Sequence, residues 1–317
     1  MVELAHPIGL EIAQRIVCSA ENSSLDWRAM YGYLEDIDDG RGYTGGLIGF
    51  CSGTGDLLDV VERYAAMSPG APLAGFIPAL RRVNGTDSHA GLGRAFERAW
   101  REAATDPAFR TAQDQIRDEQ YVRPAIEAAR RDGLRGLGQF MYYDALVMHG
   151  PGDDTDSFGG IRAAAHRRHR PPSAGGDERS YLAAFLDVRR HVMRQEEAHA
   201  DTSRLDTAQA WWLAAGNLDL EPPLRWQVYG DDYAIDTLPD RSAPAGPGGH
   251  PGRPDIPGSP AGQANPLHGL LDRWAGGLFG RQPFPGGGSL HPPRVPASHP
   301  ENAPAARRGL RQADRGS

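Results

Sequence analysis

The chain has 317 residues, of which 34 are basic and 41 acidic, so its formal net charge is −7. This acidic balance argues against a nucleic-acid-binding protein, which typically carries a clustered basic excess. No uninterrupted apolar run reaches the roughly 18 residues that a transmembrane helix needs, and the sequence therefore excludes a membrane span of this kind.

Helical periodicity dominates residues 1–237. Apolar residues recur at a spacing of four from Ile8 to Ala20, which predicts a first helix over residues 7–21. The glycine-rich residues 33–50 contain two brief extended runs, as expected for a small hairpin. Thr54 is then a candidate N-cap for a helix that continues to residue 67. Further helices are predicted over residues 73–83, 91–104, 107–121, 134–148, 181–198 and 207–215. Many helices with one small sheet near the N-terminus make an α+β protein that is predominantly α-helical.

The composition changes near residue 237, which we interpret as a domain boundary. Residues 238–317 contain 30 Pro and Gly residues among 80, a level typical of disordered chain. The formal charge changes at the same place, from −11 over residues 1–237 to +4 over the tail. We therefore expect one folded domain, residues 1–237, followed by a Pro/Gly-rich tail, residues 238–317. Within the tail, residues 267–279 combine apolar residues at helical spacing with three glycines; an apolar patch in a linker is favoured over a docking element.

The N-terminal residues lack the basic start, the apolar stretch and the small-residue cleavage site of an export signal. The two cysteines, Cys18 and Cys51, are too few for a disulfide framework and are not spaced like metal ligands. They can form at most one bridge, and two reduced, packed thiols are the favoured interpretation.

Two acidic residues have the contrasted surroundings that glycoside hydrolysis requires. Glu21 ends the first predicted helix at the edge of its apolar stripe, where burial favours the protonated form that a general acid needs. Asp39 follows in a more solvent-exposed turn beside Arg41, and we expect its carboxyl group to stay ionised. On spacing alone this pair is weak evidence, because a helix-end glutamate and a turn aspartate occur in most proteins.

Longer segments around these residues are much more specific. Residues 19–27 read Ser-Ala-Glu-Asn-Ser-Ser-Leu-Asp-Trp, residues 35–46 read Glu-Asp-Ile-Asp-Asp-Gly-Arg-Gly-Tyr-Thr-Gly-Gly, and residues 48–56 read Ile-Gly-Phe-Cys-Ser-Gly-Thr-Gly-Asp. In these segments the chain resembles the chitosanases of glycoside hydrolase family 46. The resemblance continues through residues 136–140, 142–145, 147–151, 157–161, 201–204 and 216–220. It covers about residues 10–236 and leaves the tail outside.

This resemblance implies endo-hydrolysis of chitosan, a β-1,4-linked glucosamine polymer, with inversion at the anomeric carbon and with no metal or organic cofactor. It also implies a two-lobed, lysozyme-like fold with the substrate in a cleft between the lobes. By motif, Glu21 is the general acid, Asp39 is the general base, and the Thr44 hydroxyl holds the attacking water. An inverting enzyme must leave room for that water, so we predict the two carboxyl groups to lie roughly 6.5–9.5 Å apart.

Substrate recognition is expected to depend on the free amines of chitosan, which are partly protonated at mildly acid pH. Asp56 matches the family's main amine-binding acid, although by itself it reads as a helix N-terminal charge favoured by the helix dipole. The charge of −11 on residues 1–237 independently favours a polycation as partner. Six further residues match positions that line the family's subsites: Ser23, Tyr33, Arg41, Thr54, His199 and Asp231.

Asp144, Arg189 and Arg204 match three interacting charges that the family places behind its acid. Asp144 has apolar neighbours in the sequence, and buried arginines must be paired, so we expect this trio to position and tune Glu21 rather than to react. Glu196 matches a further acidic position, but its acidic neighbour makes that assignment ambiguous.

The chain also departs from the family. The family is secreted, which implies an extracellular enzyme, yet no signal peptide is visible, and Ala200 stands where an acid often follows the histidine. One rival hypothesis is a muramidase or chitinase that cuts acetylated sugars; it is disfavoured because acetamides carry no charge for carboxylates to bind. The other is a catalytically inactive glucosamine-polymer-binding protein, disfavoured by the presence of Glu21, Asp39 and Thr44 together. We expect a monomer with glucosamine oligosaccharides as its partners.

Overall fold

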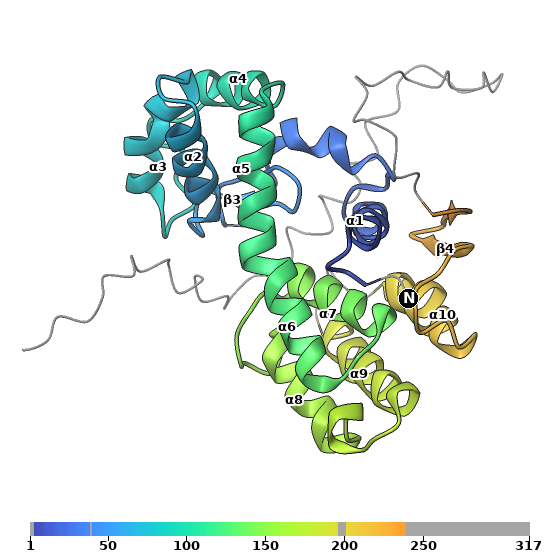
Figure 1. Cartoon of the computed structure of the whole chain (residues 1–317). Helices are drawn as coiled ribbons and strands as arrows, with labels where there is room; N and C mark the ends of the chain where they lie inside the picture. Colours follow the sequence, from blue (N-terminus) through green and yellow to red (C-terminus); the bar gives the residue numbers. More distant parts are fainter. Residues whose placement is uncertain (1–2, 39, 196–200, 239–317) are drawn as a thin grey trace, which may run out of the picture. The chain divides into compact units, whose positions relative to one another are not determined.

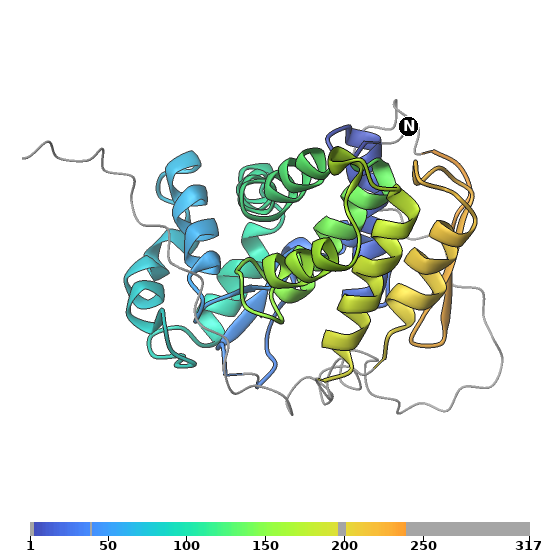
Figure 2. The same ribbon diagram turned by 90° about the horizontal axis from the view of Figure 1, so that it is seen from below.

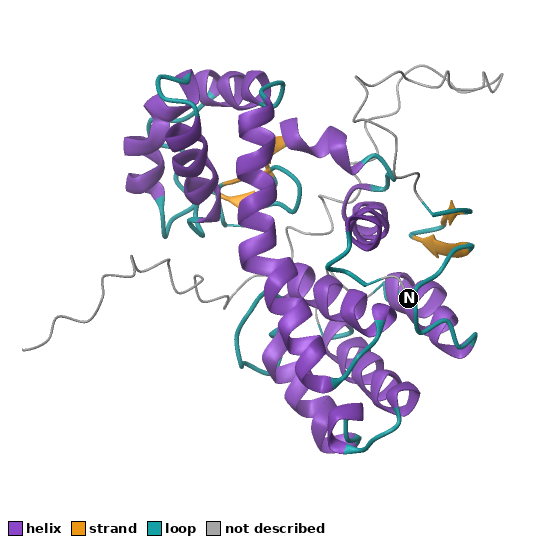
Figure 3. Ribbon diagram, in the orientation of Figure 1, coloured by secondary structure: helices purple, strands orange, loops and turns teal. Residues whose placement is uncertain are grey.

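The computed structural model describes residues 3–38, 40–195 and 201–238. Most of these residues are helical, and the strands are confined to two small antiparallel sheets (Figure 3). The predicted α+β class, predominantly α-helical, is confirmed. Asp39, Glu196 and His199 lie outside the described residues, as do Ala200 and the tail from residue 239. Among the helices that are described, none is long and apolar enough to cross a membrane.

The N-terminal elements carry most of the predicted site. Helix α1 (Pro7–Asn22) has a proline in its first turn, and His6 accepts a hydrogen bond from the Ile8 N–H as the N-cap. The 3₁₀-helix η1 (Trp27–Gly32) leads into a sheet of three strands. In this sheet β2 (Tyr43–Gly45) lies between β1 (Leu34–Asp36) and β3 (Phe50–Cys51). The register pairs Thr44 with Glu35 on one side and with Cys51 on the other.

The sheet and five helices share one apolar core, in which Phe50, Leu57 and Trp100 are fully buried. The helices of this core are α2 (Asp56–Met67), η2 (Pro72–Phe76), α3 (Ile77–Val83), α4 (Arg94–Ala103) and α5 (Pro107–Arg117). The predicted cap of α2 is wrong. Gly55 occupies the N-cap position with φ 93°, and the Thr54 hydroxyl donates instead to the Asp56 carboxylate.

A second apolar core is built around α7 (Gly136–His149), a helix that is buried on almost every side. Helix α1 packs against α7. Figure 2 shows α10 beside α9, and the hairpin β4–β5 packs against η6. The remaining elements of this core are α6 (Arg123–Asp132), α8 (Phe158–Arg168), η4 (Pro172–Ala174), α9 (Glu178–Met193), the π-helix η6 (Arg204–Gln209), α10 (Ala210–Ala214), β4 (Leu224–Val228) and β5 (Asp231–Ile235).

One helical run joins the two cores, because α5 continues through the π-helix η3 (Asp118–Val122) into α6 (Figure 1). The sequence predicted that this helix ends at residue 121, and α6 was missed. Pro124 has no N–H to donate, and the chain accommodates it with a wider turn in which the Arg123 N–H donates to the Asp118 carbonyl, five residues back. The two cores and their common helix agree with the predicted two-lobed plan.

Helix α8 and the hairpin β4–β5 were also missed. Helix α8 contains Gly159 and Gly160, which look like a turn in the sequence. A Cβ at Gly160 would lie 1.9 Å from the Asp154 carbonyl oxygen, so glycine allows the preceding loop to cross the first turn of α8 closely. The hairpin β4–β5 has a visible signal, since inward and outward side chains alternate along β4.

Candidate functional site

Glu21 lies in the last turn of α1, where the structure leaves a quarter of its side chain exposed. Its Oε1 accepts a hydrogen bond of 2.8 Å from Arg204 Nη1. Arg204 belongs to η6, 183 residues further along the chain. The predicted acid is therefore held from one side by a buried guanidinium group, with Oε2 on the same carboxyl group making no described contact with Arg204.

The charges predicted to lie behind Glu21 are in direct contact. Asp144 on α7 accepts a hydrogen bond of 2.6 Å from Arg204 on Oδ1 and one of 2.5 Å from Arg189, on α9, on Oδ2. Gln209 adds a third bond of 2.7 Å to Oδ2. Asp144 and the two arginines are at most 5% exposed. Burial by itself would raise the pKa of Asp144, but the charges of Arg204 and Arg189 hold it well below its usual value.

This arrangement balances formal charge in a buried place. Arg189 and Arg204 bring two positive charges, which the carboxylates of Asp144 and Glu21 match when both are ionised. Charges buried away from water need such pairing. The sequence did not indicate two further polar partners of the network, Gln209 and His149, the latter lying 3.1 Å from Arg189 Nε. The sequence signal that could have indicated them is a polar residue at an inward-facing position of the helix, η6 for Gln209 and α7 for His149.

Thr44, the predicted water-binding residue, lies on the central strand β2 and is 7% exposed. Its hydroxyl lies 3.4 Å from the thiol of Cys51 on β3. Neither Cys51 nor Cys18 forms a disulfide, and both are buried, in agreement with the packed thiols expected from the sequence. The contact between Thr44 and Cys51 was not anticipated, although the two residues are directly paired across the hairpin.

Asp56 is the first residue of α2 and is buried, at 6% exposed. Its Oδ1 accepts three hydrogen bonds, from the Cys51 N–H at 2.8 Å, the Leu57 N–H at 3.1 Å and the Thr54 hydroxyl at 2.6 Å. Burial raises the pKa of Asp56 to about 6, against these hydrogen bonds and the nearby charge of Arg41, which lower it. Asp56 is therefore a buried carboxyl group whose ionised form is only partly compensated by its hydrogen bonds and by Arg41.

The remaining predicted subsite residues are spread over several elements. Tyr33 follows η1, and its hydroxyl lies 3.4 Å from Glu35 Oε2. Ser23 is the C-cap of α1, with φ 49°, two residues beyond Glu21. Asp231 is the exposed first residue of β5. The hairpin that carries Asp231 is fixed to α1, because Trp226 Nε1 donates a hydrogen bond of 2.9 Å to the Ser19 hydroxyl, one half-turn before Glu21.

The turn that contains Asp39 is described only on either side of that residue. The Asp38 N–H donates to Asp36 Oδ1 at 2.9 Å, and Asp38 itself has φ 54°. On the other side, the Arg41 carbonyl accepts a hydrogen bond from the Gly53 N–H at 2.8 Å, which ties the turn to the loop after β3. The separation of the Glu21 and Asp39 carboxyl groups thus stays a prediction, as do the roles of Glu196 and His199.

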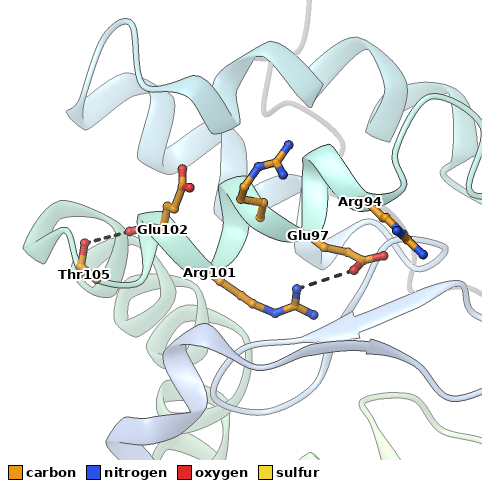
Figure 4. A pocket seen from close by; sticks show the side chains of 6 residues that line it. Arg94, Glu97, Arg101, Glu102 and Thr105 are labelled. Carbon is orange, nitrogen blue, oxygen red and sulfur yellow. Dashed lines mark hydrogen bonds and ion pairs between the residues drawn. The ribbon is translucent and has the colours of Figure 1, made fainter.

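A separate hollow of about 580 Å³ lies along α4 (Figure 4). One ion pair lies within it, between Arg101 and Glu97 at 3.6 Å, and Glu97 also accepts a hydrogen bond from the Tyr43 hydroxyl. None of the predicted site residues that the structure describes lines this hollow. Its lining is Arg94, Glu97, Arg98, Arg101, Glu102 and Thr105. Over the same described part of the chain, no three His, Cys, Asp or Glu side chains gather as they would around a metal ion.

Comparison with known proteins gives one consistent result. The family model of glycosyl hydrolase family 46 matches residues 15–224. A chitosanase of Streptomyces sp. (strain N174) is 58% identical over 234 residues, which cover 74% of this chain and 84% of that protein. A chitosanase of Bacillus subtilis (strain 168) is 36% identical over 212 residues, covering 66% and 73% of the two chains.

Solved structures give the same picture. A co-crystal structure of a chitosanase with substrate superposes with a TM-score of 0.72 at 60% identity, covering 74% of this chain and all of the other. A family 46 chitosanase of Gynuella sunshinyii in complex with chitotetraose gives a TM-score of 0.68 at 35% identity, covering 74% and 99%. This likeness extends over nearly all of the described residues and confirms the predicted fold.

Proposed function

The chain belongs to glycosyl hydrolase family 46, and from this we propose that it is an endo-acting chitosanase that cleaves β-1,4 bonds between glucosamine units with inversion. The relatives of known structure include one complexed with substrate and one with chitotetraose. The observation that carries the proposal is the contact between Glu21 and the buried charge network. It places a partly exposed carboxyl group, with one oxygen fixed, at the end of α1.

In the proposed reaction Glu21 is the general acid. Arg204 fixes Oε1, so Oε2 is the oxygen that carries the proton to the leaving glycosidic oxygen. As the bond from that oxygen to the anomeric carbon breaks, the proton moves to the departing sugar and Glu21 becomes a carboxylate. Arg204 is already in place to stabilise this negative charge. Asp144, which is itself held by Arg189, fixes the Arg204 guanidinium group.

The opposite face of the sugar receives a water molecule. Asp39 takes one of its protons while the water oxygen forms the new bond to the anomeric carbon, which inverts its configuration. Thr44 holds this water through its hydroxyl. Its position on the central strand of a three-stranded sheet supports this role, because a strand places a side chain more rigidly than a loop does.

The substrate amines are proposed to bind carboxylates, chiefly Asp56. A buried carboxylate with three neutral donors on Oδ1 pairs with an ammonium group at Oδ2, where the positive charge also favours the ionised form of Asp56. Ser23, Tyr33, Arg41, Thr54, His199 and Asp231 are proposed to line further subsites. Because chitosan is a polymer too large to enter a cell, the enzyme is proposed to act outside the cell. We also propose that it acts as a monomer.

The first experiment is anomer-resolved NMR of the products formed from fully deacetylated glucosamine hexamer. Initial appearance of the α-anomer would support glycosidic cleavage, the substrate class and inversion together. Initial β-anomer would mean retention and would remove Asp39 from its role as base to water. Binding of the hexamer without cleavage would favour the alternative function, an inactive glucosamine-polymer-binding protein.

A further inference from the structure

Strand β3 places a polar side chain directly opposite the residue proposed to hold the attacking water. Thr44 and Cys51 are cross-strand partners in the β2–β3 pair, and such partners are close neighbours on one face of the sheet. Thr44 Oγ1 lies 3.4 Å from Cys51 Sγ, and both residues are buried. Within the described part of the chain, this is the one polar contact that the Thr44 hydroxyl makes.

A second contact of the thiol decides which atom donates. Cys51 Sγ lies 3.2 Å from the carbonyl oxygen of Gly49, and a carbonyl oxygen can only accept. The single thiol proton is therefore used in that bond. Because sulfur has no other proton to give, the Thr44 hydroxyl must be the donor in its contact with Cys51, and sulfur the acceptor.

The turn between β2 and β3 supports this arrangement. Gly49 has φ 75°, a conformation that favours glycine, and a Cβ at this position would lie 3.3 Å from Thr44 Cγ2. The carbonyl that receives the thiol proton and the side chain of Thr44 are thus fixed relative to one another by the same turn. The backbone N–H of Cys51 is also occupied, by Asp56 Oδ1 at 2.8 Å, which limits rotation of the residue.

A hydroxyl that donates to sulfur can offer only its lone pairs to a water molecule. A nucleophilic water then donates one O–H to the base and the other to Thr44, and its own lone pair stays free to face the anomeric carbon. A hydroxyl that instead donated to the water would occupy one of the two lone pairs of the water oxygen, which makes that oxygen a weaker nucleophile. The direction of the hydrogen bond between Thr44 and Cys51 therefore affects how nucleophilic the bound water is.

We propose that Cys51 is a positioning residue that fixes the Thr44 hydroxyl as an acceptor for the attacking water. This inference rests on the proposed function, in which Thr44 holds that water. The thiol takes no part in bond formation and neither gains nor loses a proton during the reaction.

The kinetic test compares Cys51→Val, which removes the acceptor, with Cys51→Ser, which keeps a donor and an acceptor. We expect Cys51→Val to lower kcat about threefold to tenfold, as loss of a weak hydrogen bond implies, with KM unchanged. Cys51→Ser should retain most of kcat. In a Thr44→Val background, Cys51→Val should have no further effect. Additive losses in the double variant, a change confined to KM, or a serine variant as slow as valine would overturn the proposal.

A spectroscopic test does not depend on activity. The S–H stretching band of Cys51, assigned by its loss in Cys51→Ser, should lie at the frequency of a thiol that donates a hydrogen bond. It should shift in Thr44→Val, which removes the donor to sulfur, while the band of Cys18 stays in place. A Cys51 band at the frequency of a free thiol, or one unchanged by Thr44→Val, would contradict the inference. The two proposals can also fail separately: wild-type enzyme that does not cleave by inversion refutes the proposed function, whatever the band shows.

Discussion

Two buried carboxylates lie in different cores of this protein and have opposite electrostatic surroundings. Asp144, on α7, contacts two guanidinium groups, which hold its pKa well below the usual value. Asp56, at the start of α2, receives three hydrogen bonds from neutral donors, and burial raises its pKa to about 6. Burial is similar at the two positions, at 1% and 6% exposed, so the partners decide the outcome.

The difference separates a carboxylate that holds a structure from one that can respond to a ligand. Asp144 gains its compensating charge from the two arginines of the fold and stays ionised. It fixes Arg204, and Arg204 in turn fixes one oxygen of Glu21. The hydrogen bonds described at Asp56 come from neutral donors, and the nearby charge of Arg41 offsets burial only in part, so its ionised form is incompletely compensated until a cation arrives. A glucosamine ammonium is such a cation, and the following predictions test each side of this contrast.

The largest expected effect is at Glu21, the catalytic end of the Asp144 network. Glu21→Gln keeps the shape and an acceptor for Arg204 but cannot donate a proton as an acid. We expect kcat on glucosamine hexamer to fall by about 10²–10⁴-fold, the usual contribution of a positioned acid or base. Hexamer binding, measured by calorimetry, should persist. Unchanged turnover would remove Glu21 from the acid role.

The next effect concerns stability. Asp144→Asn leaves Arg189 and Arg204 buried without their shared counter-charge, and breaking such a pair typically costs about 3–5 kcal/mol. Urea unfolding at neutral pH should show a loss of this order. The matched control is Asp187→Asn, which removes an exposed partner of Arg190; exposed pairs contribute about 0–1 kcal/mol. Equal losses in the two variants would show that the buried network is no more important than a surface ion pair.

Acid should affect the same network in a defined direction. The folded pKa of Asp144 is depressed, so its contribution to stability is fully present above its unfolded pKa of about 4 and is lost as the pH falls toward the folded pKa. Asp144→Asn should therefore lack this part of the acid sensitivity. The difference in free energy of unfolding between wild type and variant should stay constant from neutrality down to about pH 4 and shrink as the pH is lowered further.

Asp56 should respond in the opposite sense. Its folded pKa lies above its unfolded value, so keeping it ionised opposes folding, and wild-type stability relative to Asp56→Asn should fall as the pH rises from about 4 to about 6. At neutral pH, Asp56→Asn should be as stable as wild type or more stable, by on the order of 1–3 kcal/mol. A destabilised Asp56→Asn would mean that the fold already supplies the missing counter-charge.

The same variant should weaken substrate binding. Loss of one charge-assisted hydrogen bond, worth about 1.5–3 kcal/mol, predicts that KM for fully deacetylated oligomers rises roughly tenfold to a hundredfold. The KM of wild type should also rise as the pH falls through about 6, because Asp56 then becomes protonated. Asp56→Asn should have no such step. Equal rates of wild type and variant on deacetylated chitosan would refute an amine-binding role.

The sequence predicted the class of fold, the first helix and the charge trio correctly in geometry, because each depends on strong local periodicity or on long matching motifs. It could not predict how Pro124 is absorbed into a continuous helix, since this depends on a π-turn rather than on propensity. The cap of α2 was misassigned because Thr54 bonds Asp56 instead of the helix backbone. The contact of Thr44 with Cys51 required the register of the hairpin, which the glycine turns determine and the spacing of residues does not.

The smallest expected effect concerns the tail. Glu21, Thr44, Asp56 and Asp144 all make their described contacts within residues 3–238, and the family match ends at residue 224. A chain ending at residue 240 should therefore keep wild-type kcat and KM on soluble chitosan, and its free energy of unfolding should change by less than about 0.5 kcal/mol, as for surface changes. Loss of folding in this shorter chain would show that residues 241–317 belong to the domain and that the two cores do not suffice to hold the site.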